Sequence, residues 1–338
     1  MVVRIQPYYF NAYPESTSFQ DDRMKDGVTA FLGRYFQRKV EPDLRLLKGG
    51  HSDSKNYLIE VDRVPYVLRV QDPKASLKHK QREMFAFQEA AKAGIAPKVY
   101  AVSDDCSYAL IEYMNGKTLS LEEAKQQIPV AARTMAILHS LPENPFPRKR
   151  LMDQFQKIYE ELKGHGIAFA QLDEAMAELK KLDEEILNYK IPSVAIHGDM
   201  HPRNLFFTGK ETLFAVDWEG VSRDDPFYDL IFFSMMNHLD GEEENRLLET
   251  YLKRKPFEDE AKRYGLCKKM NFIFLALTCL IQSHFSSLEE KSVLKTDAKP
   301  EDWSYYITRW AEKGEHPAQF FYDWGKSCLD RSHRADVV

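Results

Sequence analysis

The order of secondary-structure patterns along the chain restricts its fold more than any other feature. Two short β-rich runs, residues 56–61 and 65–70, are separated by a polar turn and predict a hairpin. A helical pattern follows over residues 77–93 and ends at Gly94, after which two more strand-like runs occur. This β-β-α-β-β order predicts a small antiparallel sheet that carries one helix.

From Ser120 onward the patterns become helical. Ser120 and Glu123 fit a capping box, and Pro129 suits the first turn of a second helix. Apolar residues recur at helical spacing over residues 172–189, and residues 225–338 are mainly helical in pattern. Short strand-like runs interrupt this part only twice, so it predicts a mainly helical domain.

Length and composition favour two globular lobes. A chain of 338 residues exceeds one typical core, and 43% hydrophobic with 29% charged residues is ordinary for folded proteins. We expect an α+β fold with an N-terminal lobe at residues 1–116 and a helical C-terminal lobe at 117–338. The net charge of -5 gives no reason to expect nucleic acid or an anionic membrane as a partner.

Cysteine usage and hydropathy indicate a cytoplasmic protein. None of the four cysteines forms a CxxC pair, which argues against a zinc site and suits reduced packing thiols. The N-terminus lacks the pattern of a signal peptide. The most apolar run, residues 271–281, is far short of the roughly 20 residues that span a bilayer, so it predicts a buried helix.

The strongest chemical motif is HGDMHPRN at residues 197–204, which fits the kinase catalytic-loop pattern H-x-D-x-x-x-x-N. Asp217 follows at the end of an apolar strand-like run. ATP brings several negative charges, and Mg²⁺ that neutralises them needs carboxylate and amide oxygens, which Asp217 and Asn204 can supply. Asp199, five residues before Asn204, can then orient an acceptor hydroxyl.

Two further motifs lie in the N-terminal lobe. The segment KGGHSDSKNY precedes the first strand of the hairpin, and Gly49, Gly50 and Ser52 in it suit contact with phosphates, although a plain hairpin turn remains the alternative. Arg69, on the second strand, can contact phosphate with two hydrogen bonds. Glu83, in the helix that follows, is its expected ion-pair partner, and a solvated surface pair is the alternative.

These motifs together resemble the aminoglycoside phosphotransferase and choline kinase superfamily, which shares the bilobal protein-kinase-like fold. HGDMHPRN is similar to the family's HGDxHxxN loop, and VDWEGVSRDDPFYDL to its IDxExxxxxDPxxDL segment. The resemblance implies that Asp199 is the catalytic base and that Asn204 and Asp217 hold Mg²⁺. It also implies that Arg69 and Glu83 position the phosphates of ATP.

The same resemblance places other residues. Ile111 to Met114 would form the adenine hinge, with Glu112 and Met114 as nucleotide contacts, and Asp229 would brace the catalytic loop. Asp217 is followed by Trp-Glu rather than Phe-Gly, which departs from protein kinases and argues against a protein substrate.

The acceptor is less constrained. Residues 217–229 hold five carboxylates and one basic residue, which favours a cation, and we expect Trp218, Glu219 and Asp225 to contact it. Three of the four tryptophans lie in the last 36 residues. Aromatic rings attract quaternary ammonium groups, although an aromatic-rich helical tail can equally be core.

The sequence thus predicts an ATP- and Mg²⁺-dependent kinase that phosphorylates a hydroxyl of a small cation such as choline or ethanolamine. An aminoglycoside, thiamine or amino-sugar kinase is the alternative within the class, and an inactive kinase-like binding or coat protein lies outside it. ATP and a small-molecule acceptor are the expected partners, with no nucleic acid and no membrane span. The oligomeric state is left open.

Overall fold

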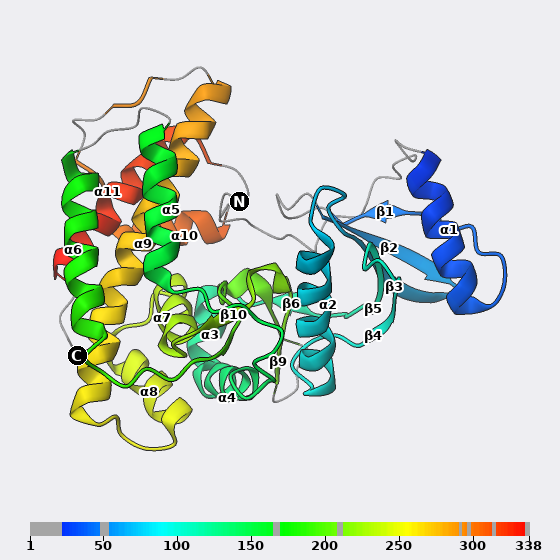
Figure 1. Ribbon diagram of the computed structural model, residues 1–338, viewed down its shortest axis with the longest axis horizontal. Helices are drawn as coiled ribbons and strands as arrows, with labels where there is room; N and C mark the ends of the chain where they lie inside the picture. The colour runs from blue at the N-terminus through cyan, green and yellow to red at the C-terminus, as the bar shows by residue number, and fades with distance from the viewer. Residues whose placement is uncertain are drawn as a thin grey trace. The chain divides into compact units, whose positions relative to one another are not determined.

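The structure of the chain is a computed structural model, shown in Figure 1. It describes residues 22–47, 54–164, 170–207, 212–290, 293–295, 299–312 and 316–334. Gly49, Gly50 and Ser52 of the expected phosphate loop lie outside these residues.

The described residues divide into two compact units. The sheet unit comprises residues 22–119 and 203–221, and the helical unit comprises residues 120–202 and 222–334. The chain enters the helical unit after Leu119, close to the strand-to-helix change in the sequence, and returns to the sheet unit for the segment that contains Asp217.

A five-stranded antiparallel sheet forms the centre of the sheet unit, with strand order β1-β2-β3-β5-β4. Its strands are β1 (Arg45–Leu46), β2 (Lys55–Val61), β3 (Val64–Val70), β4 (Val99–Val102) and β5 (Tyr108–Glu112). The expected β2–β3 hairpin is confirmed. Asp62 and Arg63 form its two-residue turn with φ of 54° and 66°, the left-handed conformation that tight hairpin turns need.

Two helices cover the sheet from opposite sides, α1 (Asp22–Phe36) and α2 (Leu77–Lys92) (Figure 1). The α1 side is apolar: Phe31 and Leu32 pack in one core with Ile59, Leu68 and Leu110. Because side chains alternate along a strand, the neighbours of Leu68 and Leu110 in sequence point to the opposite face. That second face therefore receives residues 67, 69 and 111.

The helix α2 begins and ends as the sequence predicts. Ser76 caps its start by accepting a hydrogen bond from the His79 backbone, and Gly94 follows its end with φ of 76°. A residue other than glycine would be strained in this left-handed conformation. This helix carries Glu83 on a buried position.

A second, three-stranded sheet in the sheet unit holds the segment after residue 203. Its order is β6-β8-β9. The elements are β6 (Lys117–Thr118), η1 (Pro202–Asn204), β8 (Leu205–Phe207), β9 (Leu213–Ala215) and η2 (Trp218–Gly220). Asp217 follows β9, as the apolar run predicted, and the Ala215 backbone donates to Ile95 O over 2.7 Å, which ties β9 to the end of α2.

The helical unit is built from nine helices and one two-stranded antiparallel sheet within its described residues. They are α3 (Leu121–Gln126), α4 (Ile128–Leu138), α5 (Leu151–Gly164), α6 (Ala170–Ile186), β7 (Val194–Ile196), β10 (Ser222–Asp224), α7 (Phe227–Met236), α8 (Gly241–Leu252), α9 (Glu258–Glu290), α10 (Trp303–Glu312) and α11 (Ala318–Arg334). The capping box of Ser120 and Glu123 is confirmed at the start of α3.

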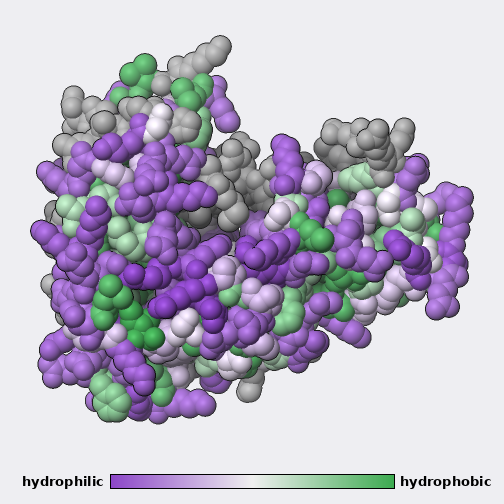
Figure 2. All heavy atoms as spheres, viewed as in Figure 1, coloured by the Kyte–Doolittle hydropathy of each residue, from purple (hydrophilic) through white to green (hydrophobic). Residues whose placement is uncertain are grey.

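Helix α9 is the core of the helical unit. Of the described helices, it alone is long and apolar enough to cross a membrane, but 89% of its apolar window is buried inside the structure. Residues 271–281 within it are all buried, as the sequence predicts. The face drawn in Figure 2 is largely hydrophilic, with hydrophobic residues in separate small patches.

Candidate functional site

A pocket lies on the face of the five-stranded sheet that α1 does not cover. Val67, Arg69 and Ile111 contribute to it from the sheet, which agrees with the alternation of side chains along β3 and β5. Every lining residue belongs to the sheet unit. They are Asn56, Val67, Arg69, Phe87, Pro97, Ile111, Glu112, Tyr113, Met114, Phe206, Val216 and Asp217.

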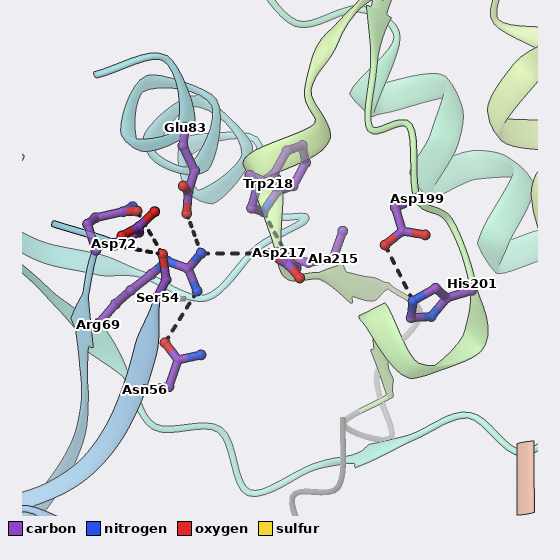
Figure 3. Close-up of polar contacts among 11 residues, drawn as sticks. Ser54, Asn56, Arg69, Asp72, Glu83, Asp199, His201, Ala215, Asp217 and Trp218 are labelled. Carbon is purple, nitrogen blue, oxygen red and sulfur yellow. Dashed lines mark hydrogen bonds and ion pairs between the residues drawn. The ribbon is translucent and has the colours of Figure 1, made fainter. Parts of the chain in front are cut away.

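Arg69 is the central charge of this pocket. Its guanidinium lies 2.7 Å from Glu83 and 3.6 Å from Asp217, so it joins β3, α2 and the segment after β9 (Figure 3). It also reaches Asn56 Oδ1 at 3.5 Å across the hairpin. The expected Arg69–Glu83 pair is therefore confirmed, and it is buried rather than a solvated surface pair: the side chains are only 4% and 2% exposed.

The charges in this cluster oppose one another. Burial raises the pKa of the Glu83 carboxyl, the Arg69 guanidinium opposes that rise, and the negative charge of Asp217 adds to it. One cation thus faces two carboxylates at short range. Added positive charge beside Asp217 would relieve the repulsion between the two acids, which suits a site for a metal ion.

Asp217 and Asn204 are brought together by backbone pairing. The Val216 backbone donates to Asn204 O over 3.0 Å, which places Asn204 beside the residue that precedes Asp217. Asp217 has φ of 65°, a left-handed conformation that is uncommon outside glycine and concentrates at functional sites.

The donor set around Asp217 and Asn204 suits Mg²⁺. Mg²⁺ is usually held by one or two protein oxygens together with the phosphates of a substrate. Within the residues that the structure covers, no group of three or more His, Cys, Asp or Glu is placed to hold a metal ion. The carboxylate of Asp217 and the amide of Asn204 are donors of the kind that hold Mg²⁺ together with substrate phosphates.

The hinge expected at residues 111–114 lines the pocket along its whole length. The Glu112 side chain accepts from the Lys98 backbone over 3.0 Å, and the Glu112 backbone donates to Lys98 O over 2.8 Å. Glu112 and Met114 both line the pocket, and their contact with a nucleotide stays a prediction.

Sequence reasoning missed other pocket residues, of which Asn56 and Tyr113 are the most polar. Asn56 is paired with Arg69 in the β2–β3 register, so the predicted hairpin could have identified it. Ser54, the first described residue after the expected phosphate loop, donates to Gln71 Oε1 and accepts from the Asp72 backbone, both over 3.1 Å. These bonds fix the start of β2 beside the end of β3.

The residues expected to contact an acceptor are placed unequally. Trp218 is 1% exposed, its indole donates to Ala215 O over 3.1 Å, and it is not among the pocket's lining residues. Glu219, in the same short helix, is half-buried. The structure thus makes Trp218 a packing residue and leaves Glu219 partly accessible.

Asp225 belongs to the helical unit and is buried there. It forms an ion pair with Arg263 of α9, and it accepts from the Phe227 backbone over 2.9 Å at the start of α7. Arg263 offsets its charge, so Asp225 stabilises the packing of α7 on α9.

The tryptophans of the C-terminal tail also pack. Trp303, Trp310 and Trp324 are at most 6% exposed. Trp303 contacts Phe272 of α9, and Trp310 contacts Trp324 with ring centroids 6.1 Å apart. These rings are core residues, which is the second of the two interpretations that the sequence allowed.

The catalytic-loop motif lies in the helical unit up to Pro202. Asp229 of α7 accepts from the backbones of His197 and Gly198 over 2.8 and 2.9 Å, which confirms that it braces the loop. Gly198 has φ of 82°, a conformation that suits glycine immediately before Asp199.

The Asp229 oxygen that accepts from His197 also lies 3.1 Å from Nε2 of His139, which follows α4, and the other ring nitrogen of His139 lies 2.9 Å from the Tyr251 hydroxyl. The Asp199 side chain is 37% exposed and lies 3.4 Å from His201 (Figure 3). A braced loop that presents an accessible carboxylate can orient a hydroxyl group.

Together, the antiparallel sheet with its ion-paired pocket and the helical unit with its braced loop define the protein-kinase-like α+β fold class. The chain belongs to the phosphotransferase enzyme family (APH), which matches it over residues 43–266. That range contains the pocket, the loop and Asp217.

One curated relative matches part of the chain. Protein LicA of Haemophilus influenzae is 27% identical over 209 residues, and the match covers 60% of this chain and 61% of LicA. The chain therefore matches less than two thirds of that relative's length.

Solved structures agree on the fold. The choline/ethanolamine kinase family protein from Mesorhizobium loti matches with a TM-score of 0.62 and 20% identity, over 90% of this chain and 99% of that one. Choline kinase LicA from Streptococcus pneumoniae matches with a TM-score of 0.61 and 16% identity, over 93% of this chain and 98% of that one.

Proposed function

We propose that this chain is an ATP- and Mg²⁺-dependent kinase that phosphorylates the hydroxyl of a small cationic alcohol of the choline or ethanolamine type. The single observation that carries the proposal is the buried Arg69–Glu83 pair beside Asp217, in a pocket whose other wall is the 111–114 segment. Membership of the phosphotransferase family supports it.

The nucleotide is assigned to the pocket of the sheet unit. Apolar side chains such as Val67, Phe87 and Ile111 suit an adenine ring, while the main chain at Glu112 and Met114 offers hydrogen bonds. Arg69, oriented by Glu83, is the donor that a phosphate oxygen would meet at the charged end.

The metal and the base are assigned by residue chemistry. Asn204 and Asp217 would hold Mg²⁺, which when bound neutralises charge on the bridging phosphate oxygens. Asp199 orients the acceptor hydroxyl and accepts its proton. In a loose phosphoryl-transfer transition state positioning is most of what the base supplies, so a weakly basic carboxylate suffices.

The choice of a choline-like acceptor depends on relatives more than on the site. Proteins named choline kinase and choline/ethanolamine kinase share the fold, and LicA shares sequence. The buried tail tryptophans and the arginine-paired Asp225 remove two of the arguments from sequence. Glu219 remains as the candidate that recognises a positive charge.

The experiment is a screen for ADP release with purified protein, ATP and Mg²⁺ over choline, ethanolamine, thiamine, aminoglycosides and amino sugars. We expect choline or ethanolamine to give the highest kcat/KM. The Asp199→Ala variant is the control and should lose several orders of magnitude in turnover, because it lacks the orienting group.

Two outcomes would contradict this proposal in different ways. A neutral or anionic best acceptor, or a bulky amino-sugar compound, would change the acceptor and leave the roles of Asp199 and Asp217 intact. ADP release that Asp199→Ala retains at more than about a tenth of wild type would remove the catalytic assignment itself. We also propose a reduced cytoplasmic setting, which the four free cysteines suit.

A further inference from the structure

His201 lies in the catalytic-loop motif but has no role in the function proposed above. Its ring is 1% exposed, and its Nε2 lies 3.4 Å from Asp199 Oδ2 (Figure 3). Its backbone N–H also donates to the Asp199 carbonyl over 2.9 Å. His201 is therefore linked to Asp199, the proposed base, through both main chain and side chain.

The burial of His201 determines which ring nitrogen carries the hydrogen. Within the described part of the chain, Nδ1 of His201 is buried and has no hydrogen-bond partner. A hydrogen on Nδ1 would therefore be left unsatisfied, which is costly. The hydrogen belongs on Nε2, where it faces the Asp199 carboxylate.

The ring of His201 also contacts the helical tail. Trp310 of α10 meets it edge to face, with ring centroids 5.4 Å apart and planes at 79°. Trp310 is 1% exposed and contacts Trp324 of α11. A closely packed tryptophan allows the imidazole few orientations, so its hydrogen-bond donor points in a fixed direction.

Asp199 needs such support because it is exposed. Its side chain is 37% accessible, so a contact that holds one oxygen helps to set the orientation of the carboxylate. Tyr228 of the helical unit also interacts with Asp199: burial and then the charge of Asp199 raise the pKa of the Tyr228 hydroxyl well above its usual value.

We propose that His201, clamped by Trp310, is a positioning residue that donates from Nε2 to Oδ2 of Asp199 and so fixes the direction in which this carboxylate faces the acceptor hydroxyl. The role rests on the function proposed above. The 3.4 Å separation suits this role, since catalytic hydrogen bonds are often long without substrate and shorten when the reactants bind.

The test is a double-mutant cycle between the two residues. His201→Leu should lower kcat by about 10- to 100-fold, with the ATP KM within about twofold of wild type, because misorientation affects only the acceptor step. His201→Gln keeps a donor and should recover most of the loss. In an Asp199→Asn background, followed in single turnovers, His201→Leu should have no further effect.

A merely structural role gives a different pattern. It predicts losses that multiply in the double variant, or an ATP KM that rises as kcat falls, and either result would overturn the proposal. If Asp199→Asn alone retains wild-type turnover, the assignment of the base fails instead, so the two failures are distinguishable.

The tryptophans provide a matched comparison that leaves His201 and Asp199 in place. Trp310→Phe replaces the indole that contacts His201 with a smaller ring. Trp324→Phe makes the same substitution at the residue that packs against Trp310. We expect kcat to fall about 3- to 10-fold in the first variant only, with similar thermal stability in both. Equal kcat values would refute the clamp.

Discussion

Arg69 shows how one residue can serve both folding and phosphate binding. Its guanidinium is 4% exposed and faces Glu83 and Asp217, so the burial of each of the three charges depends on the other two. Removing one member of a buried ion pair leaves an uncompensated charge, which costs far more than the pair itself contributes. Replacing one charged residue of the cluster should therefore destabilise the fold more than replacing both partners of an ion pair with apolar residues.

The Arg69→Met variant should lose about 3–5 kcal/mol of unfolding free energy, because Glu83 is then buried without its partner. The double variant Arg69→Met, Glu83→Leu should recover a large part of that loss while ATP affinity stays low in both. Urea denaturation and nucleotide titration measure the two effects. If the unfolding free energy of Arg69→Met lies within about 1 kcal/mol of wild type, the pair contributes no more than a solvent-exposed ion pair does.

The Glu219→Gln variant tests acceptor recognition at the same scale. It removes one negative charge and keeps the shape, so the acceptor KM should rise about tenfold, while the ATP KM stays nearly constant. Steady-state kinetics with choline and with ATP separate the two constants. An unchanged acceptor KM would show that Glu219 does not contact the cation.

Single residues were predictable from sequence where a motif or a pairing register fixed them. The pairing of Arg69 with Glu83 followed from their positions on the hairpin and the next helix, and the contact of Asp229 with the loop backbone followed from the family resemblance. Trp218 and Asp225 did not, because a short linear pattern does not reveal whether a tryptophan is buried or whether an arginine such as Arg263, 38 residues away, offsets a charge.

At the scale of elements, the sequence predicted the helices and strands whose ends carry a capping or turn residue, and it missed those without such residues. The turn at Asp62, the cap at Ser76 and the capping box at Ser120 mark the ends of elements by local chemistry. Helix α1 and strand β10 lack such signals. Tertiary packing determines them: α1 through the core that it shares with the sheet, and β10 through its pairing with β7.

The two-stranded β7–β10 sheet contains a group that makes stability depend on pH. Asp224, at the end of β10, accepts from the Leu151 backbone at the start of α5 over 3.1 Å. Burial raises the pKa of its carboxyl from 3.8 to about 7, and Arg150 opposes the rise. Between those values the folded chain holds a proton that the unfolded chain has released, so stability falls as the pH rises through this range.

The Asp224→Asn variant should therefore match wild type near pH 4 and exceed it increasingly up to pH 7, by about 2–4 kcal/mol at pH 8. Asparagine keeps the acceptor for Leu151 and cannot ionise. Asp225→Asn is the contrasting control: it leaves Arg263 unpaired and should destabilise the chain throughout. Thermal unfolding from pH 4 to 8 measures both, and parallel pH curves for wild type and Asp224→Asn would contradict the prediction.

At the scale of the whole molecule, the chain distributes its proposed functions between the two units. The nucleotide pocket, Asn204 and Asp217 belong to the sheet unit, whereas Asp199 belongs to the helical unit. The sequence predicted two lobes with the change at residues 116–117, and that boundary stays a prediction. It did not suggest that residues 203–221 would cluster with the first unit, because this return depends on β6 pairing with β8.

This division predicts how the whole protein responds to nucleotide. A ligand that binds only the folded state raises stability by about 2.7 kcal/mol at 100 times its Kd. ATP should therefore raise the Tm of wild type, and more so with Mg²⁺, because Asn204 and Asp217 would hold the metal beside the phosphates. Asp217→Asn should keep the rise in Tm that ATP causes without Mg²⁺ and lose the additional rise that Mg²⁺ causes, since an amide is a poorer ligand for a hard cation.

Asp199→Ala is the matched control from the other unit. It should show the full Mg²⁺-dependent rise in Tm and yet no phosphoryl transfer, because Asp199 acts on the acceptor and not on the metal. This pattern separates an active kinase from a kinase-like binding protein, which would bind nucleotide but show no turnover in wild type either. If Asp199→Ala loses the Mg²⁺-dependent shift, or Asp217→Asn retains it, the metal does not lie where the sheet unit's residues place it.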